Sequence, residues 1–195
     1  MPMKKPVCMI HSVRFKAVLD TNVVFPIVIR DLLFWLAYYE LYTPKWSAHI
    51  FDEWKDVMLR KDVSVVEAEK RIQRANKAFP DALVKNYEVL IEHLNLPDPR
   101  DCHVLAAAIK TNANVIVTNN LKDFPAEYLT SFGLTAKSAD DFLTDIIDLN
   151  PEQAILAFKE MVLNRRNPAM NEFEVLDSLR KSGLTDTANY LHALL

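Results

Sequence analysis

Two aspartates follow the two most strand-like stretches of the chain. Asp20 comes directly after the apolar segment 14–19, and Asp123 follows the β-branched run 114–118 within one short loop. In an open parallel sheet, functional sites form outside the carboxyl ends of the strands. If these two strands are neighbours, the two carboxylates converge at one edge of the sheet.

Three further acids are placed so that they could join this pair. Asp98 and Asp101 open a predicted helix over 99–110, and Glu53 lies in a predicted helix that starts near Ser47. Carboxylates that share a small volume repel one another, so such a group requires a cation. Oxygen ligands without His or Cys favour Mg²⁺ or Mn²⁺. One or two such ions can activate water and hold a phosphodiester for in-line attack.

The elements that would position these acids alternate along the first two thirds of the chain. Short strands are expected at 14–19, 41–43, 114–118 and 134–136. Helices are expected at 27–39, 47–60, 64–79, 99–110 and 126–132. Strands separated by helices indicate parallel βαβ units and a three-layer α/β fold.

The strand signals stop after about residue 138, and four helices are expected in the tail, at 138–148, 151–164, 172–181 and 185–195. Asn–Pro pairs and a glycine separate them, as is typical of turns. We therefore expect three parts: an N-terminal arm over 1–13, an α/β domain over 14–137 and an all-helical extension over 138–195.

The composition bounds the class of protein. The chain has 195 residues, of which 50% are hydrophobic and 25% charged, with a net charge of −3, so it predicts a globular protein without a general attraction to nucleic acid. Two glycines, Gly133 and Gly183, exclude a glycine-rich phosphate loop. Two cysteines, Cys8 and Cys102, build neither a disulfide framework nor a Cys-based zinc site, which favours the cytoplasm. The sequence contains no run of about 18 apolar residues, so no membrane span is predicted.

Four segments together resemble those of a known family. They read VLDTNV at 18–23, Ser47 followed by Glu53, DPRDCHVLAAA at 98–108 and VTNNLKDFP at 117–125. In this order and spacing the chain resembles the PIN-domain nucleases over roughly residues 14–136, especially the bacterial branch that includes VapC-type toxins. The resemblance implies a three-layer PIN-like fold with a central parallel sheet, a divalent metal and endoribonuclease chemistry. The helical tail resembles the extension of a subset of PIN toxins.

The resemblance also implies which residues act. The family's acidic quartet maps onto four residues that would hold the metal and carry catalysis: Asp20, Glu53, Asp101 and Asp123. Four further residues are expected to support them: Asn22, Asp98, Thr118 and Asn120. Asn120 stands where many members of the family have Asp, a departure that would weaken a second metal site.

Four of these acids also have a purely structural interpretation. Asp20 could merely end a strand, and Asp123 could cap the helix that follows it. Asp98 and Asp101 could be charges that the helix dipole stabilises, by about 0.3–1 kcal/mol each. Only their joint presence favours a site.

Glu53 is the weakest of the acids as a single signal, because it lies in a charged stretch and could belong to a solvated helix face. Asp52 replaces it if the match slips by one residue. His49 and His103 are expected to be residues of a helix face and not general bases, because a bound ion can activate water without histidine.

Contacts with partners are predicted from three surfaces. Lys70, Arg74 and Lys77 recur at helical spacing, and this face could hold an RNA backbone through its phosphates or simply be solvated. The aromatic cluster is expected to be core in the main and in part an interface of a homodimer: Phe34, Trp35, Tyr38, Tyr39 and Tyr42. The apolar faces of the tail must be buried against the chain itself, a second copy or an antitoxin protein.

These observations favour a metal-dependent endoribonuclease that acts on RNA, in the setting of a toxin–antitoxin pair. A non-catalytic PIN-fold binding or regulatory module is the alternative, and Asn120 supports it. A hydrolase of small phosphoesters could use the same metal chemistry. The aspartyl-phosphate type is disfavoured, because the first strand is followed by Asp20-Thr21-Asn22 and not by Asp-x-Asp.

Overall fold

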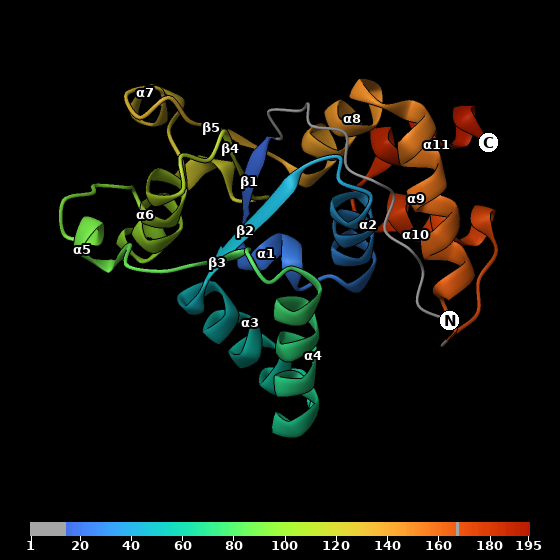
Figure 1. Ribbon diagram of the computed structural model, residues 1–195, viewed down its shortest axis with the longest axis horizontal. Coiled ribbons are helices and arrows are strands. Elements are labelled where there is room, and N and C mark those ends of the chain that lie inside the picture. Colours follow the sequence, from blue (N-terminus) through green and yellow to red (C-terminus); the bar gives the residue numbers. More distant parts are fainter. Residues whose placement is uncertain (1–14, 167) are drawn as a thin grey trace.

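A parallel sheet of five strands forms the centre of the computed structural model, which describes residues 15–166 and 168–195. The strands lie in the order β3-β2-β1-β4-β5, and every neighbouring pair is parallel (Figure 1). Their bounds are Lys16–Leu19 (β1), Thr43–Ser47 (β2), Leu83–Val84 (β3), Val115–Val117 (β4) and Thr135–Lys137 (β5). The expected N-terminal arm, 1–13, lies outside the described residues.

Helices lie between and after the strands. In the sheet-bearing part they are α1 (Thr21–Val24), α2 (Ile27–Tyr38), α3 (Ala48–Arg60), α4 (Val65–Ala78), α5 (Glu88–Ile91), α6 (Cys102–Lys110) and α7 (Ala126–Thr130). Two 3₁₀ turns join them, η1 (Pro99–Asp101) and η2 (Leu121–Asp123). The tail holds α8 (Ala139–Leu149), α9 (Pro151–Asn164), α10 (Glu172–Lys181) and α11 (Thr185–Leu194).

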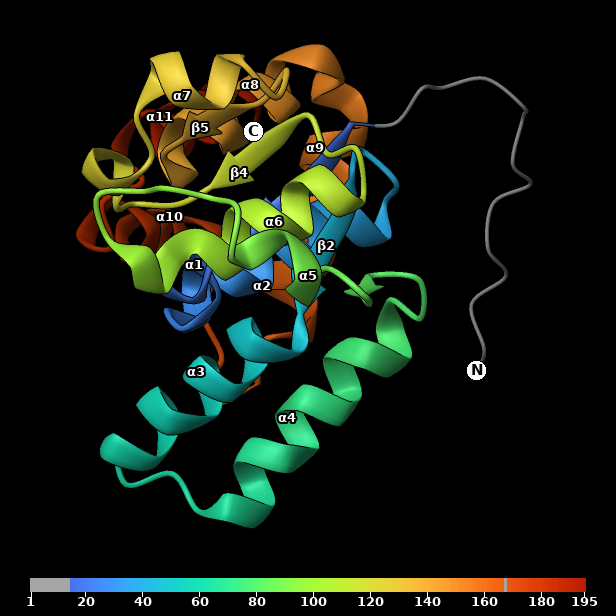
Figure 2. The same ribbon diagram turned by 90° about the vertical axis from the view of Figure 1, so that its left-hand side faces the viewer.

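The helices cover both faces of the sheet. α6 packs against β1, β2 and β4 on one face, while α2 and the tail helices lie on the other (Figure 1). Seen from the side, α3 and α4 form a hairpin that projects from the sheet (Figure 2). The expected three-layer α/β fold with a central parallel sheet and a helical tail is therefore confirmed.

The central strands form because their residues are apolar without interruption. Val18, Leu19, Ile116 and Val117 are fully buried, which is the pattern of a parallel strand covered on both faces. Leu19 pairs with Val117 in the register. β1 and β4 are thus neighbours, and their carboxyl ends meet at the same edge.

The second strand differs from its expected position. This strand was expected over residues 41–43 and was expected to stop before Pro44. Instead, β2 runs over Thr43–Ser47 and includes the proline. Pro44 pairs with Ala17 of β1, whereas β3 reaches β2 only opposite Trp46 and Ser47. A missing N–H is tolerated where no neighbouring strand needs it.

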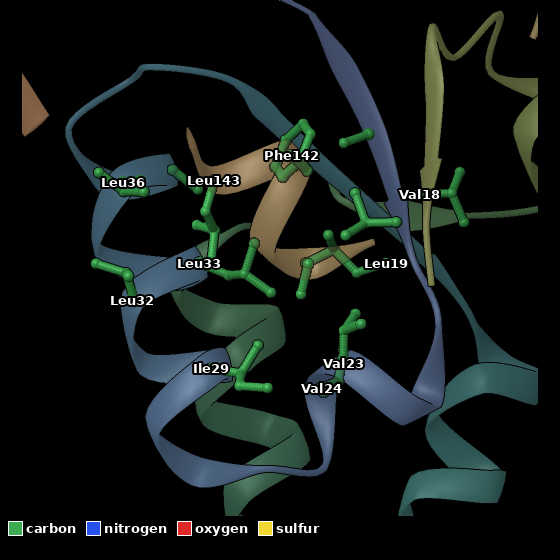
Figure 3. Close-up of a cluster of buried hydrophobic side chains, with 14 of the residues drawn as sticks. Val18, Leu19, Val23, Val24, Ile29, Leu32, Leu33, Leu36, Phe142 and Leu143 are labelled. Atoms are coloured by element: carbon green, nitrogen blue, oxygen red, sulfur yellow. The ribbon is translucent and has the colours of Figure 1, made fainter. Parts of the chain in front are cut away.

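The tail packs on the rest of the chain. α9 and α10 contact α2, and α11 contacts α8. Phe142 of α8 lies edge-to-face with Tyr42, with ring centroids 5.0 Å apart, and its neighbour Leu143 joins Leu33 of α2 in one buried cluster (Figure 3). Phe142, Leu143 and much of the rest of the tail's apolar faces are therefore buried against the chain itself.

The aromatic cluster is divided between core and surface. Tyr42 is buried and donates a hydrogen bond to the backbone oxygen of Leu33, at 2.9 Å. Tyr38 is exposed, and Trp35 lies against it edge-to-face. Within residues 15–166 and 168–195, no helix has the length and apolar character needed to cross a bilayer.

Candidate metal and catalytic site

Asp20 lies where β1 ends and α1 begins. Its backbone N–H donates to the oxygen of Val117 at 3.1 Å, which holds it beside β4. Its side chain is buried and accepts from the backbone N–H of Thr21 at 2.6 Å and from Thr118 Oγ1 at 2.7 Å. Burial raises the pKa of Asp20, and the hydrogen bonds from Thr118 and Thr21 oppose that rise.

Asn22 and Thr118 fix the Asp20 carboxylate. Asn22 Nδ2 donates to Asp20 Oδ2 at 2.5 Å and lies 2.9 Å from Thr118 Oγ1. Thr118 gives its one proton to Asp20, and its oxygen then accepts from the backbone N–H of Asn120 at 3.0 Å. The structure therefore brings two of the four expected supporting residues, Asn22 and Thr118, to Asp20.

Asn119, in the loop that follows β4, is bonded to the first residue of the helical tail. Its backbone N–H donates to Asn22 Oδ1 at 2.8 Å, and its own Oδ1 accepts from the backbone N–H of Ala139, the first residue of α8, at 3.1 Å. Asn119, the residue after Thr118, is thus bonded both to Asn22 and to the start of α8.

Three other acids form a compact group. Asp98, Asp101 and Asp123 each offer an oxygen, and these oxygens all lie within 4.8 Å of one another. Burial, and then the negative charges of Asp20 and Asp98, raise the pKa of Asp101 to about 6. A divalent cation would remove this repulsion, and hard oxygen ligands are the type that Mg²⁺ and Mn²⁺ prefer. The donor set therefore fits such an ion.

Asp98 also has a structural partner. Its carboxylate caps the 3₁₀ turn η1 by accepting from the backbone N–H of Arg100 at 3.0 Å, and it pairs with the guanidinium of Arg100 at 2.7 Å. The hydrogen bonds from Arg100 lower the pKa of Asp98. The helix expected over 99–110 therefore opens as a 3₁₀ turn before α6.

Asn120 bridges two of the acids. Its Nδ2 donates to Asp123 Oδ2 at 2.5 Å and to Asp101 Oδ2 at 3.3 Å. An amide at this position adds a donor where a carboxylate would add a further negative charge. Asn120 thus holds Asp101 and Asp123 together.

Glu53 approaches the other acids from α3. Its Oε2 accepts from Thr21 Oγ1 at 2.6 Å, and its Oε1 lies 3.1 Å from His103 Nε2. Burial alone would raise the pKa of Glu53, but the hydrogen bonds from His103 and Thr21 outweigh it and lower the pKa below its ordinary value. Asp52 is exposed, so Glu53 is the acid of this stretch that faces the site.

The four acids of the expected quartet lie at one edge of the sheet but in two arrangements. The charges of Glu53 and Asp20 both act on Asp101, which places them within electrostatic reach. Glu53 and Asp20 are nevertheless outside the compact group of carboxylates. Their oxygens are engaged by donors from α1 and its neighbours.

Sequence reasoning missed two side chains of the site. Thr21 binds Glu53, and His103, which was expected on a helix face, is buried against it. Thr21 follows Asp20 directly, so its place beside the acids could have been inferred. Nothing in the single sequence links His103 on α6 with Glu53 on α3.

The expected RNA-binding residues lie apart from the carboxylates in the chain. Lys70, Arg74 and Lys77 are all exposed on α4, and α4 packs along α3, the helix that carries Glu53. The hairpin of α3 and α4 projects from the sheet (Figure 2).

The sequence of the chain matches two family profiles. The profile described as "PIN domain" matches residues 16–122, and a second profile, "VapC50 C-terminal domain", matches residues 139–193. The chain belongs to the PIN-domain family, which confirms the resemblance read from its motifs, including the VapC-like branch with a C-terminal extension.

One particular relative carries a functional name. The chain is similar to "Putative ribonuclease VapC50" of Mycobacterium tuberculosis (strain ATCC 25618 / H37Rv), with 41% identity over 105 residues. The match covers 54% of this chain and 62% of the relative, so the chain spans less than two thirds of that protein. No solved structure matches the chain significantly.

Proposed function

We propose that the protein is a metal-dependent endoribonuclease that hydrolyses RNA phosphodiesters. The observation that carries the proposal is the meeting of Asp98, Asp101 and Asp123 within 4.8 Å beside the buried Asp20. Membership of the PIN-domain family and the printed name of the relative support the same chemistry.

Mg²⁺ or Mn²⁺ is the proposed cofactor, and Asp20, Glu53, Asp101 and Asp123 are its proposed ligands and catalytic acids. A divalent cation supplies the charge that activates water and offsets the negative charge developing on the phosphate. The residues of the chain hold the carboxylates in place before an ion binds. Thr118 and Asn22 fix Asp20, Asn120 holds Asp101 beside Asp123, and Asp98 supports the group.

The proposed setting is a toxin–antitoxin pair in the cytoplasm, in which the protein is a homodimer and a small antitoxin protein blocks the acidic cleft. The family and the relative's VapC name support this setting. We further propose that residues 14–137 form the nuclease domain and residues 138–195 the extension, a division that the two profile matches support. The face of Lys70, Arg74 and Lys77 is the proposed contact for the RNA backbone.

The test is cleavage of a defined RNA by the purified protein with Mn²⁺, with and without a chelator. The Asp20→Asn variant is expected to lose cleavage, because it removes a buried negative charge from the edge where the acids meet. Asp52→Asn is the matched control, since Asp52 is exposed on the same helix as Glu53. Cleavage that survives in Asp20→Asn would contradict the proposal and indicate another site or a contaminant.

A non-catalytic binding or regulatory module is the second candidate. The bridge from Asn120 to Asp101 and Asp123 favours it, because these acids are held together by an amide. Isothermal titration of the wild-type protein with Mn²⁺ separates the two functions. Binding supports the nuclease, and the absence of binding supports the module.

A further inference from the structure

His103 is a buried histidine that the proposed function does not use. It lies on α6, in a turn whose other residues are apolar and buried, and only 8% of its surface is exposed. A buried imidazole is costly unless its polar atoms find partners. Its polar contact among the described residues is with Glu53, through Nε2 at 3.1 Å from Oε1.

The carboxylate of Glu53 fixes the direction of this hydrogen bond. His103 Nδ1 is buried and has no hydrogen-bond partner within residues 15–166 and 168–195. A carboxylate can only accept a hydrogen bond from the ring, so the proton stands on Nε2 and points at Glu53.

Glu53 is thereby held through both of its oxygens. Thr21 Oγ1 lies 2.6 Å from Oε2, and His103 Nε2 lies 3.1 Å from Oε1. The two donors come from α1 and α6, elements that the sheet keeps in place. A glutamate side chain has several accessible rotamers, and two donors from separate elements select the one that faces the acids.

A second histidine restrains the ring of His103. The rings of His49 and His103 lie 5.3 Å apart. His49 is itself fixed by a hydrogen bond between its Nδ1 and the hydroxyl of the buried Tyr87, at 2.8 Å. The imidazole of His103 therefore lies close to a fixed ring and to the carboxylate that it binds.

We propose that His103 is a positioning residue, which holds the Glu53 carboxylate beside the other acids by the hydrogen bond from Nε2. The proposal rests on the proposed function, in which Glu53 is a ligand of the divalent ion. Partners that orient a metal ligand in this way commonly change metal affinity by about 10–100-fold when they are removed.

The test compares two amide substitutions of one histidine. Gln places its amide nitrogen near the position of Nε2 and can still donate to Glu53, whereas the shorter Asn places it near Nδ1 and leaves Glu53 Oε1 without a donor. We expect His103→Asn to weaken Mn²⁺ binding about tenfold in isothermal titration. His103→Gln is expected to restore most of that affinity.

A double-mutant cycle shows whether His103 acts through Glu53. In a Glu53→Gln background, His103→Asn is expected to cause no further loss of Mn²⁺ affinity, because the group that it positions has already been changed. A purely structural histidine would lower the affinity by the same factor in both backgrounds. Equal losses in the two backgrounds, or wild-type affinity in His103→Asn, would overturn the proposal.

A failure of the proposed role of His103 can be distinguished from a failure of the proposed function and from a failure to fold. Wild-type protein that binds no Mn²⁺ contradicts the nuclease itself, whereas wild-type binding that Asp101→Asn removes and His103→Asn leaves intact contradicts only the role of His103. If neither histidine variant folds, ¹⁵N NMR of the wild-type protein with Mg²⁺ decides. The proton of His103 is expected on Nε2, and a proton on Nδ1 alone would refute the hydrogen bond.

Discussion

At the scale of the residue, the acids of the site are held close together at an energetic cost. Asp101 shows this most clearly, because burial and neighbouring carboxylates raise its pKa to about 6. The folded protein therefore binds the Asp101 proton more tightly than the unfolded chain, whose carboxyl has the ordinary value of 3.8. By linkage, such a group favours folding at pH below 3.8, and this contribution is lost as the pH rises through 6.

The contribution of Asp101 to the stability of the metal-free protein is accordingly expected to be lost between about pH 4 and pH 6, so Asp101→Asn is expected to gain stability relative to the wild type over this interval. Urea unfolding of both proteins in the presence of a chelator, at a series of pH values, measures the difference. Asp52→Asn, which changes an exposed acid, is expected to follow the wild type. Parallel pH profiles for wild type and Asp101→Asn would refute the expected interaction among the acids.

The residues also show where prediction from sequence ends. Asp20, Asp101 and Asp123 could be placed because each follows or opens an element whose end is readable from its apolar pattern. The pairing of Glu53 with His103 could not, because it depends on how α3 packs toward α6 and leaves no mark in either segment.

At the scale of the element, α3 matters most because it carries Glu53 out from the sheet edge. Ser47 ends β2 and caps α3, with its fully buried hydroxyl accepting from the backbone N–H of Ile50 at 3.2 Å. Ser64 caps α4 in the same manner but is exposed. The two serines therefore offer a matched pair of caps, one on the helix that holds a proposed ligand.

Ser47→Ala is expected to lower the free energy of unfolding by about 1 kcal/mol and to weaken Mn²⁺ binding as well, because α3 loses its anchored start. Ser64→Ala is expected to cost a similar free energy and to leave Mn²⁺ binding as it was. Urea unfolding and isothermal titration measure the two effects. Equal Mn²⁺ affinities for the two variants would show that the cap of α3 does not influence the site.

The basic face of α4 gives a second prediction at this scale. The double variant Lys70→Glu with Arg74→Glu is expected to weaken RNA binding and to reduce the slope of log affinity against log salt by about 1–2, because phosphate contacts are lost. Lys159→Glu with Lys181→Glu, both exposed in the tail, is the control with the same change of charge. RNA affinity that is equal in the two double variants would assign α4 to a solvated face.

The bounds of the helices and strands could be predicted from the sequence with different success. The helices at 151–164 and 172–181 agree with their expected bounds, because proline, asparagine and apolar periodicity mark both ends. β2 was expected too early because Pro44 is a strand breaker in general. Its tolerance here depends on where β3 begins, which is a fact of tertiary structure.

At the scale of the whole molecule, the tail and the sheet share one buried core. Residues of α8, α9, α10 and α11 belong to the same buried cluster as β1 and α2. The division of the chain at residue 137 therefore follows the change from strands to helices, and it stays a prediction as a boundary of domains. Unfolding of the tail would expose the face of α2 that it covers.

Phe142→Ala is expected to cost about 3–5 kcal/mol, because the ring is buried against Tyr42 and its removal leaves a cavity. Phe173→Ala, at an exposed position of α10, is expected to cost much less. Urea unfolding followed by tryptophan fluorescence, which reports on Trp35, Trp46 and Trp54 in the sheet-bearing part, measures both. A loss below about 1 kcal/mol for Phe142→Ala would indicate that the tail and the sheet unfold independently.

The two hydrogen bonds of Asn119 join distant parts of the chain through a single residue. One end is bonded to Asn22, beside the buried acid of the first strand, and the other to the opening turn of α8. The appended helices therefore cannot swing outward as a rigid block without releasing a strut of the loop that carries Thr118. Displacement of the tail would therefore act on the acidic edge through Asn119 as well as through the shared buried core.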